Sequence, residues 1–339
     1  MALPDASRYS LADDLTINRI LNGMWQVSGA HGSIEPSAAL RAMFDYMDAG
    51  FTTWDLADHY GPAEDFVGEF RRQLTAVRGP DAANGILAFT KWVPRPGPMT
   101  REIVESNIDI SRRRMGMERL DLLQFHWWDY RDIRYLDALS HLADLRDEGK
   151  IREVALTNFD TQRMQDIAAH GVRVVSNQVQ YSLIDRRPEV AMSAFCQEQE
   201  SSLLAYGTLC GGLLSDRYLG QPEPSVGALN TASLRKYKQM IDAWGGWNLF
   251  QQLLSALKAV ADRHDATIAN VAVRCILDRP AVAGVIVGAR LGVAEHIADN
   301  ARVFDIKLDA NDLATIEAVL AHSRDLYRLI GDCGDEYRR

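Results

Sequence analysis

The sequence has little cysteine, and its cysteines are not spaced as pairs. The four show neither a CxxC pattern nor the spacing of metal ligands: Cys196, Cys210, Cys275 and Cys333. Isolated thiols of this kind are typical of a reducing cytosol rather than of a disulfide framework. The chain also lacks a basic start followed by a short apolar run, and it has no run of about 18 apolar residues that could cross a bilayer. We therefore expect a cytoplasmic protein without a membrane-spanning segment.

An excess of positive charge is also absent. The chain carries 37 Lys and Arg residues against 46 Asp and Glu residues, a formal net charge of −9. Nucleic acids and anionic membranes are bound through basic faces, so this charge argues against both as partners. Neither GxGxxG after the first strand-like run nor GxxxxGK(S/T) occurs, so no Rossmann fingerprint or P-loop is expected. An anionic ligand would need local cations, and the sequence leaves the oligomeric state open.

Short strand-like runs alternate with helix-like segments along almost the whole chain. The runs cover residues 19–25, 51–57, 86–92, 121–127, 151–159, 174–182, 201–209 and 283–289. Helices are expected at residues 36–50, 64–74, 100–116, 133–148, 161–170, 188–200 and 233–263. This alternation indicates parallel βα units, and eight such units predict an α/β fold of the closed (β/α)8 TIM-barrel type.

No linker divides the chain, so we expect one barrel domain over residues 1–339. Residues 10–20 come before the first barrel run and predict an N-terminal β-hairpin. Residues 93–98 and 220–230 are rich in Pro and Gly and indicate loops above the barrel rather than domain boundaries. The C-terminal extension after the last run can fold back across the barrel or stay mobile, and its sequence does not decide between the two.

Polar and aromatic residues stand at the end of every strand-like run. In a (β/α)8 barrel the carboxyl ends of the strands form the active face. A lysine or histidine buried there without a partner would be costly. Each residue alone has a structural explanation, such as a satisfied core histidine or a lysine that extends to solvent. Together on one rim they indicate a site: Trp25, Gln26, Asp55, Lys91, His126, Thr157, Asn158, Gln178, Tyr206, Gly288 and Arg290.

Four residues near this rim suit proton transfer. Asp55, Lys91 and His126 end three successive runs, and Tyr60 lies five residues past Asp55. A phenol has a pKa near 10, so it must be tuned and positioned to donate a proton at neutral pH. A nearby ammonium favours the phenolate, and a carboxylate keeps that ammonium charged and in place. The four residues supply these parts.

The order of the motifs resembles the aldo-keto reductase superfamily over essentially the whole chain. The segment DLADHYG at 55–61 matches the family's Asp and Tyr, FTKW at 89–92 its Lys, and DLLQFHWW at 121–128 its His. Four further motifs match the family's cofactor side: LTNF at 156–159, VVSNQVQY at 174–181, AYGTLCGGLLSDRY at 205–218 and GVIVGARLGVAEHIADN at 284–300. Seven motifs in this order are a specific signal, whereas any one alone would be weak.

The resemblance implies reversible hydride transfer between a nicotinamide and a carbonyl or alcohol carbon. Tyr60 would be the general acid in reduction, and Lys91 would lower the pKa of its phenol. Asp55 would pair with Lys91. His126 would orient the carbonyl oxygen and stabilise the charge that develops there.

A set of cofactor-binding residues is implied in the same way. The carboxamides of Asn158 and Gln178 would hold the amide group of the nicotinamide, and Tyr206 would stack on its ring. Residues 209–217 would wrap the pyrophosphate. The full set is Trp25, Asp55, Thr157, Asn158, Gln178, Tyr206, Gly207, Leu209, Gly211, Gly288, Arg290, His296, Asp299 and Asn300, of which the last two match the positions that address the adenine. At Gly207 the family's usual serine is missing, which puts one hydrogen bond in doubt.

The last motif bears on the choice between NADP(H) and NAD(H). Family members that bind NADPH usually place a cation, then a hydroxyl, and later a second basic or polar residue there to hold the 2′-phosphate. This chain has Arg290, then Leu291, and later His296. Arg290 can hold a phosphate with two hydrogen bonds, whereas the hydroxyl is missing and His296 is mostly neutral at pH 7. We expect NADP(H), with NAD(H) as the alternative.

Aromatic residues near the expected carbonyl position predict a substrate pocket formed by Trp25, Trp54, Trp92, Trp127 and Trp128, with Tyr130, Trp244 or Trp247 as further walls. Such walls suit apolar or ring-shaped carbonyl compounds, and also sugars. The alternative for each tryptophan is a packing role in the core.

Three other functions are open at this point. One is an NAD(H)-linked sugar or alcohol dehydrogenase. Another is a cofactor-binding regulatory subunit with negligible turnover, as the potassium-channel β-subunit branch of the superfamily suggests. The third is a metal-dependent barrel hydrolase that uses Asp55, Asp58, His59 and His126. An HExxH motif is absent and Lys91 would repel a cation in the same site, so we expect no metal.

Overall fold

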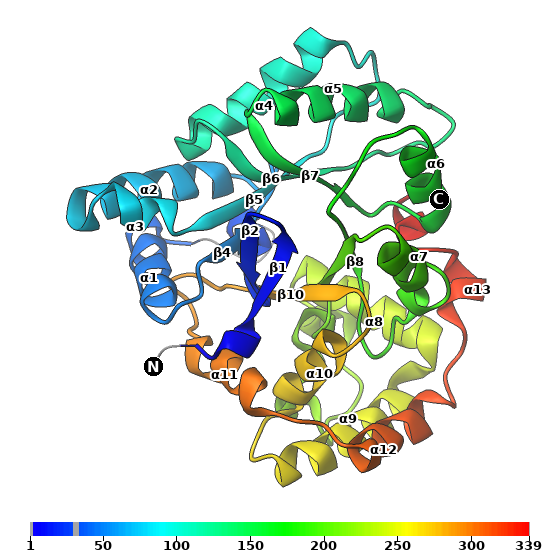
Figure 1. The fold of residues 1–339 in the computed structure, drawn as a ribbon. Coiled ribbons are helices and arrows are strands. Elements are labelled where there is room, and N and C mark those ends of the chain that lie inside the picture. Colours follow the sequence, from blue (N-terminus) through cyan, green and yellow to red (C-terminus); the bar gives the residue numbers. More distant parts are fainter. Residues whose placement is uncertain (1–2, 30–33, 339) are drawn as a thin grey trace.

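Eight parallel strands form a closed barrel in the computed structural model, which describes residues 3–29 and 34–338 (Figure 1). Neighbouring strands pair in the order β10-β3-β4-β5-β6-β7-β8-β9, and the barrel closes between β9 and β10. The strands are β3 (Ile20–Gly23), β4 (Thr53–Asp55), β5 (Leu87–Trp92), β6 (Leu120–Phe125), β7 (Ile151–Thr157), β8 (Ser176–Gln180), β9 (Ser202–Tyr206) and β10 (Val282–Gly288). Each strand overlaps one of the eight strand-like runs, so the predicted (β/α)8 barrel is confirmed.

An antiparallel hairpin precedes the barrel, as the sequence predicts. It consists of β1 (Arg8–Ala12) and β2 (Leu15–Asn18). Its buried side chains, among them Leu11 and Ile17, share one apolar cluster with residues of the barrel strands such as Phe89. The hairpin therefore fills one end of the barrel, and the carboxyl ends of the strands remain available for a site.

Helices surround the barrel. They are α1 (Pro36–Asp48), α2 (Ala63–Arg78), α3 (Pro80–Asn84), α4 (Arg101–Met115), α5 (Tyr135–Asp147), α6 (Thr161–Ala169), α7 (Met192–Glu198), α8 (Ala232–Trp244), α9 (Gly246–Arg263), α10 (Ile268–Leu277), α11 (Ile297–Arg302), α12 (Ala310–Leu320) and α13 (Leu326–Ile330). Helix α4 begins and ends where its sequence indicates. The hydroxyl of Thr100 accepts from the Ile103 amide at 3.4 Å, and Gly116 ends the helix in the left-handed conformation with a φ of 62°.

The carboxyl-terminal third departs from the expected helices. The sequence predicts one helix over residues 233–263, but the chain forms α8 and α9 there, because Gly246 adopts a φ of 81° that interrupts the helix. Helix α10 lies outside the predicted set. Its apolar run IANVAVRCIL does not distinguish a buried helix from a strand by periodicity alone. The capping box of Thr267 and Asn270 is the signal that would have identified it.

The C-terminal segment returns to the barrel after α12 and α13. In Figure 1 it is drawn in red and ends beside α6. A turn at Asp335–Tyr337 brings Arg338 to the ends of two strands, where its guanidinium donates to the carbonyl oxygens of Asn158 at 2.7 Å and Trp127 at 2.6 Å. The segment thus folds back across the barrel, which is the first of the two alternatives that the sequence leaves open.

All four cysteines are buried and unpaired: Cys196, Cys210, Cys275 and Cys333. Burial raises the pKa of each thiol above its usual value. Within residues 3–29 and 34–338, no helix has both the length and the apolar character needed to span a membrane.

Candidate active site

The four predicted catalytic residues line one cavity at the carboxyl ends of the strands. The cavity has a volume of about 1330 Å³. Asp55 ends β4, Lys91 lies near the end of β5, and His126 directly follows β6. Tyr60 reaches the same cavity from the loop after β4. The structure therefore brings together all four residues that the sequence singles out.

Asp55 and Lys91 form a buried ion pair at the bottom of the cavity. The ammonium Nζ of Lys91 lies 2.7 Å from Oδ2 of Asp55 and also donates to the carbonyl oxygen of Leu56 at 2.9 Å. Each side chain is only 4% exposed. Desolvation lowers the pKa of Lys91, and the charge of Asp55 opposes that shift. The pair therefore holds the ammonium of Lys91 in one position beside the rest of the site.

Two glutamines complete the hydrogen bonding of Asp55. Its Oδ1 accepts from the amide of Gln124 at 2.9 Å and from that of Gln178 at 2.6 Å, and the Gln178 amide also donates to the Oε1 of Gln124 at 2.6 Å. Both glutamines are buried. Gln124 is not among the residues predicted from the sequence, although it lies two residues before His126 and therefore shares its face of the strand. With Lys91, three donors hold this carboxylate in place.

The phenol of Tyr60 lies above the ion pair. Its ring packs edge-on against Trp25, with 4.9 Å between ring centres, and the Nζ of Lys91 lies 5.0 Å from its centre. Burial raises the pKa of Tyr60 well above its usual value, and the negative charge of Asp55 adds to the shift. The shift is opposite in direction to the lowering by Lys91 that the resemblance implies, because Asp55 offsets the ammonium and desolvation dominates. Tyr60 is therefore protonated at neutral pH.

His126 is neutral and in one defined tautomer. Desolvation lowers its pKa to about 4. Its Nδ1 lies 3.1 Å from the carbonyl oxygen of Thr157, which can only accept, so Nδ1 carries the proton. The Nε2 atom is buried and has no hydrogen-bond partner among the described residues. In this tautomer Nε2 accepts a hydrogen bond rather than donating one, which differs from the expected donor that stabilises charge on a carbonyl oxygen.

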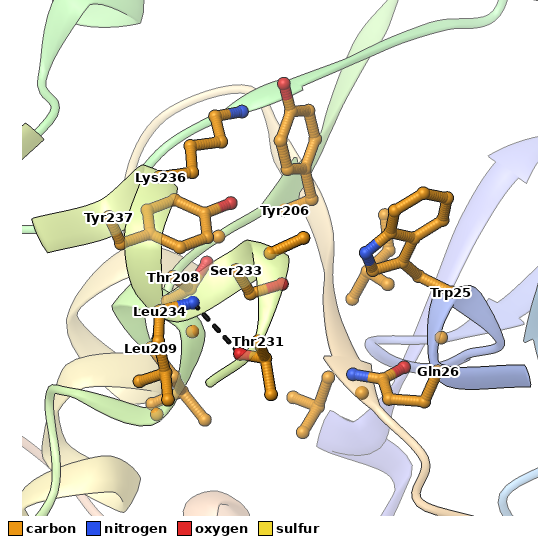
Figure 2. A pocket seen from close by; sticks show the side chains of 18 of the residues that line it. Trp25, Gln26, Tyr206, Thr208, Leu209, Thr231, Ser233, Leu234, Lys236 and Tyr237 are labelled. Atoms are coloured by element: carbon orange, nitrogen blue, oxygen red, sulfur yellow. Dashed lines mark hydrogen bonds between the residues drawn. The ribbon is translucent and has the colours of Figure 1, made fainter. Parts of the chain in front are cut away.

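All the residues expected to bind the cofactor line the same cavity. In Figure 2, Trp25 and Gln26 stand on the side of the cavity opposite Thr208, Leu209 and Tyr237. Besides Asp55, the expected residues in the lining are Trp25, Thr157, Asn158, Gln178, Tyr206, Gly207, Leu209, Gly211, Gly288, Arg290, His296, Asp299 and Asn300. Trp25 follows β3, and the others come from β7 to β10 and from the segments that follow these strands. Residues far apart in the sequence thus form one continuous wall.

A tyrosine from α8 fills the space left by the missing serine at position 207. Gly207 has a φ of 72°, and a Cβ there would overlap the hydroxyl of Tyr237. Tyr237 lines the cavity as well. A hydroxyl is therefore present near this position after all, supplied by a residue that the sequence motif does not include.

Three basic side chains in the cavity wall have no carboxylate partner. Arg217, Lys236 and Arg290 lie more than 4.0 Å from any carboxylate of residues 3–29 and 34–338, whereas Lys238, two positions along α8, pairs with Glu223 and Asp242. The wall is suited to an anionic ligand such as a phosphate.

Only two of the five predicted pocket tryptophans reach the cavity. Trp25 and Trp128 line it. Trp54 and Trp92 lie next to the inward-facing Asp55 and Lys91, so they point to the opposite side of their strands and pack into the core around the barrel. Trp127 is also fully buried, and its indole donates to the carbonyl oxygens at 129 and 132. These three predictions were wrong.

The other aromatic residues considered for the pocket also have structural roles. The hydroxyl of Tyr130 bonds to the backbone of Asn158 and Asp160. Trp244 and Trp247 are buried in an apolar cluster of α8 and α9. Lys236, Tyr237 and Tyr337 line the cavity instead, none of which the sequence motifs indicated.

The residues considered for a metal site have other partners. Asp58 binds the ring of His59 at 2.7 Å and the amide of Val93 at 3.0 Å, while Asp55 is held by Lys91. In the part of the chain that the structure describes, no three His, Cys, Asp or Glu side chains are grouped so that they could hold a metal ion.

Comparison with known proteins gives one family. A model of the aldo/keto reductase family matches residues 19–321. Protein tas of Escherichia coli strain K12 is 28% identical over 328 residues, which cover 85% of this chain and 91% of that protein. Flagellar radial spoke protein 5 of Chlamydomonas reinhardtii is 26% identical over 278 residues, and the match spans 72% of this chain but only about half, 52%, of that protein.

Solved structures share the barrel. A glycerol dehydrogenase from Gluconobacter oxydans gives a TM-score of 0.76 at 21% identity, covering 97% of this chain and 98% of that chain. A thermostable aldo-keto reductase gives a TM-score of 0.69, also at 21% identity, covering 92% and 99%. At 21% identity, the similarity to these structures supports the barrel fold alone.

Proposed function

Because this chain belongs to the aldo/keto reductase family, whose members are oxidoreductases that act on small-molecule carbonyl compounds, we propose that it reversibly reduces aldehydes or ketones to alcohols with NADP(H). One observation carries the proposal. The phenol of Tyr60 is half-buried and protonated beside the ion pair of Lys91 and Asp55, within a cavity large enough for both a dinucleotide and a substrate. A protonated phenol held in this way is a proton donor.

The residues of this chain fit a nicotinamide dinucleotide, which supplies the hydride when it is bound. Arg217 and Arg290 are exposed cations in the cavity wall and suit phosphate groups. Tyr206 offers a ring for stacking against the nicotinamide. The carboxamides of Asn158 and Gln178 suit its amide group, and Asp299 and Asn300 suit the adenine.

Proton transfer in the reduction belongs to Tyr60. The phenol gives its proton to the carbonyl oxygen of the substrate while the carbonyl carbon is reduced. The phenolate that remains is stabilised by the ammonium of Lys91, which Asp55 keeps in position. His126 is neutral, so its Nε2 accepts a hydrogen bond from the hydroxyl group of an alcohol and orients it.

The preference for NADP(H) over NAD(H) rests on Arg290. Arg290 lies two residues after the end of β10 and lines the cavity. Within residues 3–29 and 34–338, no carboxylate lies within 4.0 Å of its guanidinium. A guanidinium in that state can bind a 2′-phosphate with two hydrogen bonds. On the substrate side, Trp25 and Trp128 give the cavity an aromatic wall, which suits a carbonyl compound with an apolar or ring-shaped face.

The test combines binding and turnover in wild-type protein and Tyr60→Phe. NADPH and NADH are titrated against the fluorescence of the seven tryptophans, and reduction of a panel of aldehydes and ketones is followed at 340 nm. We expect tighter binding of NADPH than of NADH. Loss of the proton donor should lower kcat by about a hundredfold or more, while the Kd for NADPH changes by less than about twofold.

A matched control is Tyr9→Phe, which removes a phenol in the hairpin that bonds to Ser202 at 3.3 Å. Its kcat should equal that of the wild type. Substantial turnover by Tyr60→Phe would contradict the role of Tyr60 as the acid. Binding of NADPH without turnover of any carbonyl compound would favour the regulatory subunit over the enzyme.

A further inference from the structure

The C-terminal segment 332–338 is built into the wall of the cavity. Arg187 is fully buried and pairs with Asp185 through two hydrogen bonds of 2.8 Å. Its remaining nitrogen donates to the carbonyl oxygen of Asp332 at 3.0 Å and to the carboxylate of Glu336 at 2.9 Å. A buried guanidinium left without these partners would be costly, so the contacts hold the segment in one place.

The segment converges on Asn158, a residue in the left-handed conformation with a φ of 58°. The guanidinium of Arg338 donates to the carbonyl oxygen of Asn158 at 2.7 Å. Gly334 has a φ of 88° and lies so close to the same oxygen that a Cβ would overlap it. The backbone of Asn158 is thereby held between the barrel, through the carbonyl oxygen of Gln178 at 2.9 Å, and the C-terminal segment.

The side chain of Asn158 is reached from the same segment through a chain of hydroxyls. The hydroxyl of Tyr206 donates to the Oδ1 of Asn158 at 2.8 Å and lies 2.9 Å from the hydroxyl of Tyr337. The ammonium of Lys236 donates to the hydroxyl oxygen of Tyr337. Figure 2 shows the Lys236 side chain extended toward the hydroxyl end of Tyr206.

The direction of these hydrogen bonds follows from the number of protons that each group can donate. Each hydroxyl has one proton to donate. Tyr206 uses its proton on Asn158, so it must accept from Tyr337, which in turn accepts from Lys236. The chain therefore runs from a cation to an amide oxygen, and hydrogen bonds aligned in this way strengthen one another.

The consequence concerns the orientation of the Asn158 carboxamide. Its oxygen is occupied by Tyr206, while its Nδ2 has no hydrogen-bond partner in residues 3–29 and 34–338, and the residue lines the cavity. We propose that the chain Lys236–Tyr337–Tyr206 fixes this carboxamide so that Nδ2 donates to the amide oxygen of a bound nicotinamide. Tyr337 is then a positioning residue for the cofactor, an inference that rests on the proposed function.

The experiment distinguishes binding of the nicotinamide end of the cofactor from binding of its adenosine end. NADPH and adenosine 2′,5′-bisphosphate, which lacks the nicotinamide, are titrated against wild type and Tyr337→Phe by tryptophan fluorescence. We expect the Kd for NADPH to rise by about three- to tenfold, the range for one lost hydrogen bond, and the Kd for the bisphosphate to stay unchanged. Tyr337 is 36% exposed, so the variant should keep the stability of the wild type.

The matched control is Tyr327→Phe in α13, a tyrosine of the same C-terminal region that does not line the cavity. It should bind both ligands as the wild type does. A second measurement uses Tyr206→Phe and the double variant with Tyr337→Phe. Because Tyr337 acts through Tyr206, the double variant should bind NADPH no more weakly than Tyr206→Phe alone.

Three results would overturn the inference. They are an unchanged Kd for NADPH in Tyr337→Phe, an equal rise for both ligands, and additive losses in the double variant. Failure of the wild type to bind NADPH at all would contradict the proposed function. Because the wild type is measured before any variant, this outcome is distinguished from failure of the inference about Tyr337.

Discussion

At the scale of single residues, the site depends on which side of its strand each residue occupies. The rim residues were predicted correctly as cavity-lining because function in a barrel lies at the carboxyl ends of the strands. Trp54 and Trp92 were assigned wrongly because they neighbour Asp55 and Lys91 in sequence and therefore face the other way. The same alternation, applied to β6, would have identified Gln124.

Two chemical properties of the site could not be predicted from the sequence. The raised pKa of Tyr60 depends on how deeply the phenol is buried and on the nearby carboxylate of Asp55. The tautomer of His126 depends on the carbonyl oxygen of Thr157, a contact between residues 31 positions apart. Both properties arise from tertiary packing, and a motif carries no information about solvent exposure.

His126 makes stability depend on pH in a defined window. Its pKa in the folded protein is about 4, and in the unfolded chain it returns to about 6.5. Below pH 6.5 the unfolded chain therefore binds more protons, so the free energy of unfolding falls as the pH falls toward 4. Compared with His126→Gln, the wild type should lose up to about 3 kcal/mol more between pH 7 and pH 4.

Urea denaturation of both proteins at pH 7, 6, 5 and 4 measures this difference. The absolute stability of His126→Gln does not matter, since only the change with pH is compared. Parallel curves for the two proteins would show that His126 titrates normally in the folded state and would contradict the neutral tautomer.

At the scale of elements, the sequence located every barrel strand but not every helix. Strands of a barrel are short apolar runs between turn residues, a pattern that this chain repeats eight times. The break between α8 and α9 is caused by the left-handed conformation of Gly246, which composition alone does not reveal. Close packing of neighbouring helices is equally hidden, and Gly68 in α2 is an example. A Cβ at Gly68 would overlap the carbonyl oxygen of Arg114 at the end of α4.

Gly68→Ala should push these two helices apart. Overpacking against backbone costs about 1 to 3 kcal/mol, and the free energy of unfolding should fall by that amount in urea denaturation. Gly227→Ala is the matched control, because no atom lies within 4 Å of its added Cβ and its φ is not positive. That variant should be within about 0.5 kcal/mol of the wild type. Equal stability of the two variants would mean that α2 shifts without cost.

At the scale of the whole molecule, local pattern was sufficient for the barrel but not for the C-terminal segment. The order of the strands follows from βα alternation, since successive parallel strands lie side by side. The path of residues 332–338 depends instead on Arg187, nearly 150 positions earlier, and on Asn158. Neither residue resembles a docking signal in the sequence, so the return of the chain to the cavity could only be seen in the structure.

The four buried cysteines can report local opening of the structure through the rate at which each thiol is alkylated. A thiol reacts with an alkylating reagent only when it is exposed as a thiolate, so none of the four should be labelled in the closed protein. Cys333 lies in the C-terminal segment, whereas the other three lie within the barrel and its helices. Release of the segment alone exposes Cys333, and the remaining thiols require larger unfolding.

Peptide mapping after pulses of iodoacetamide should therefore show Cys333 labelled well before Cys196, Cys210 and Cys275, and NADPH should slow the labelling of Cys333 selectively. One common rate for all four would mean that the segment separates only when the barrel itself unfolds. The native sequence thus allows the lifetime of the closed cavity to be measured without introducing any probe.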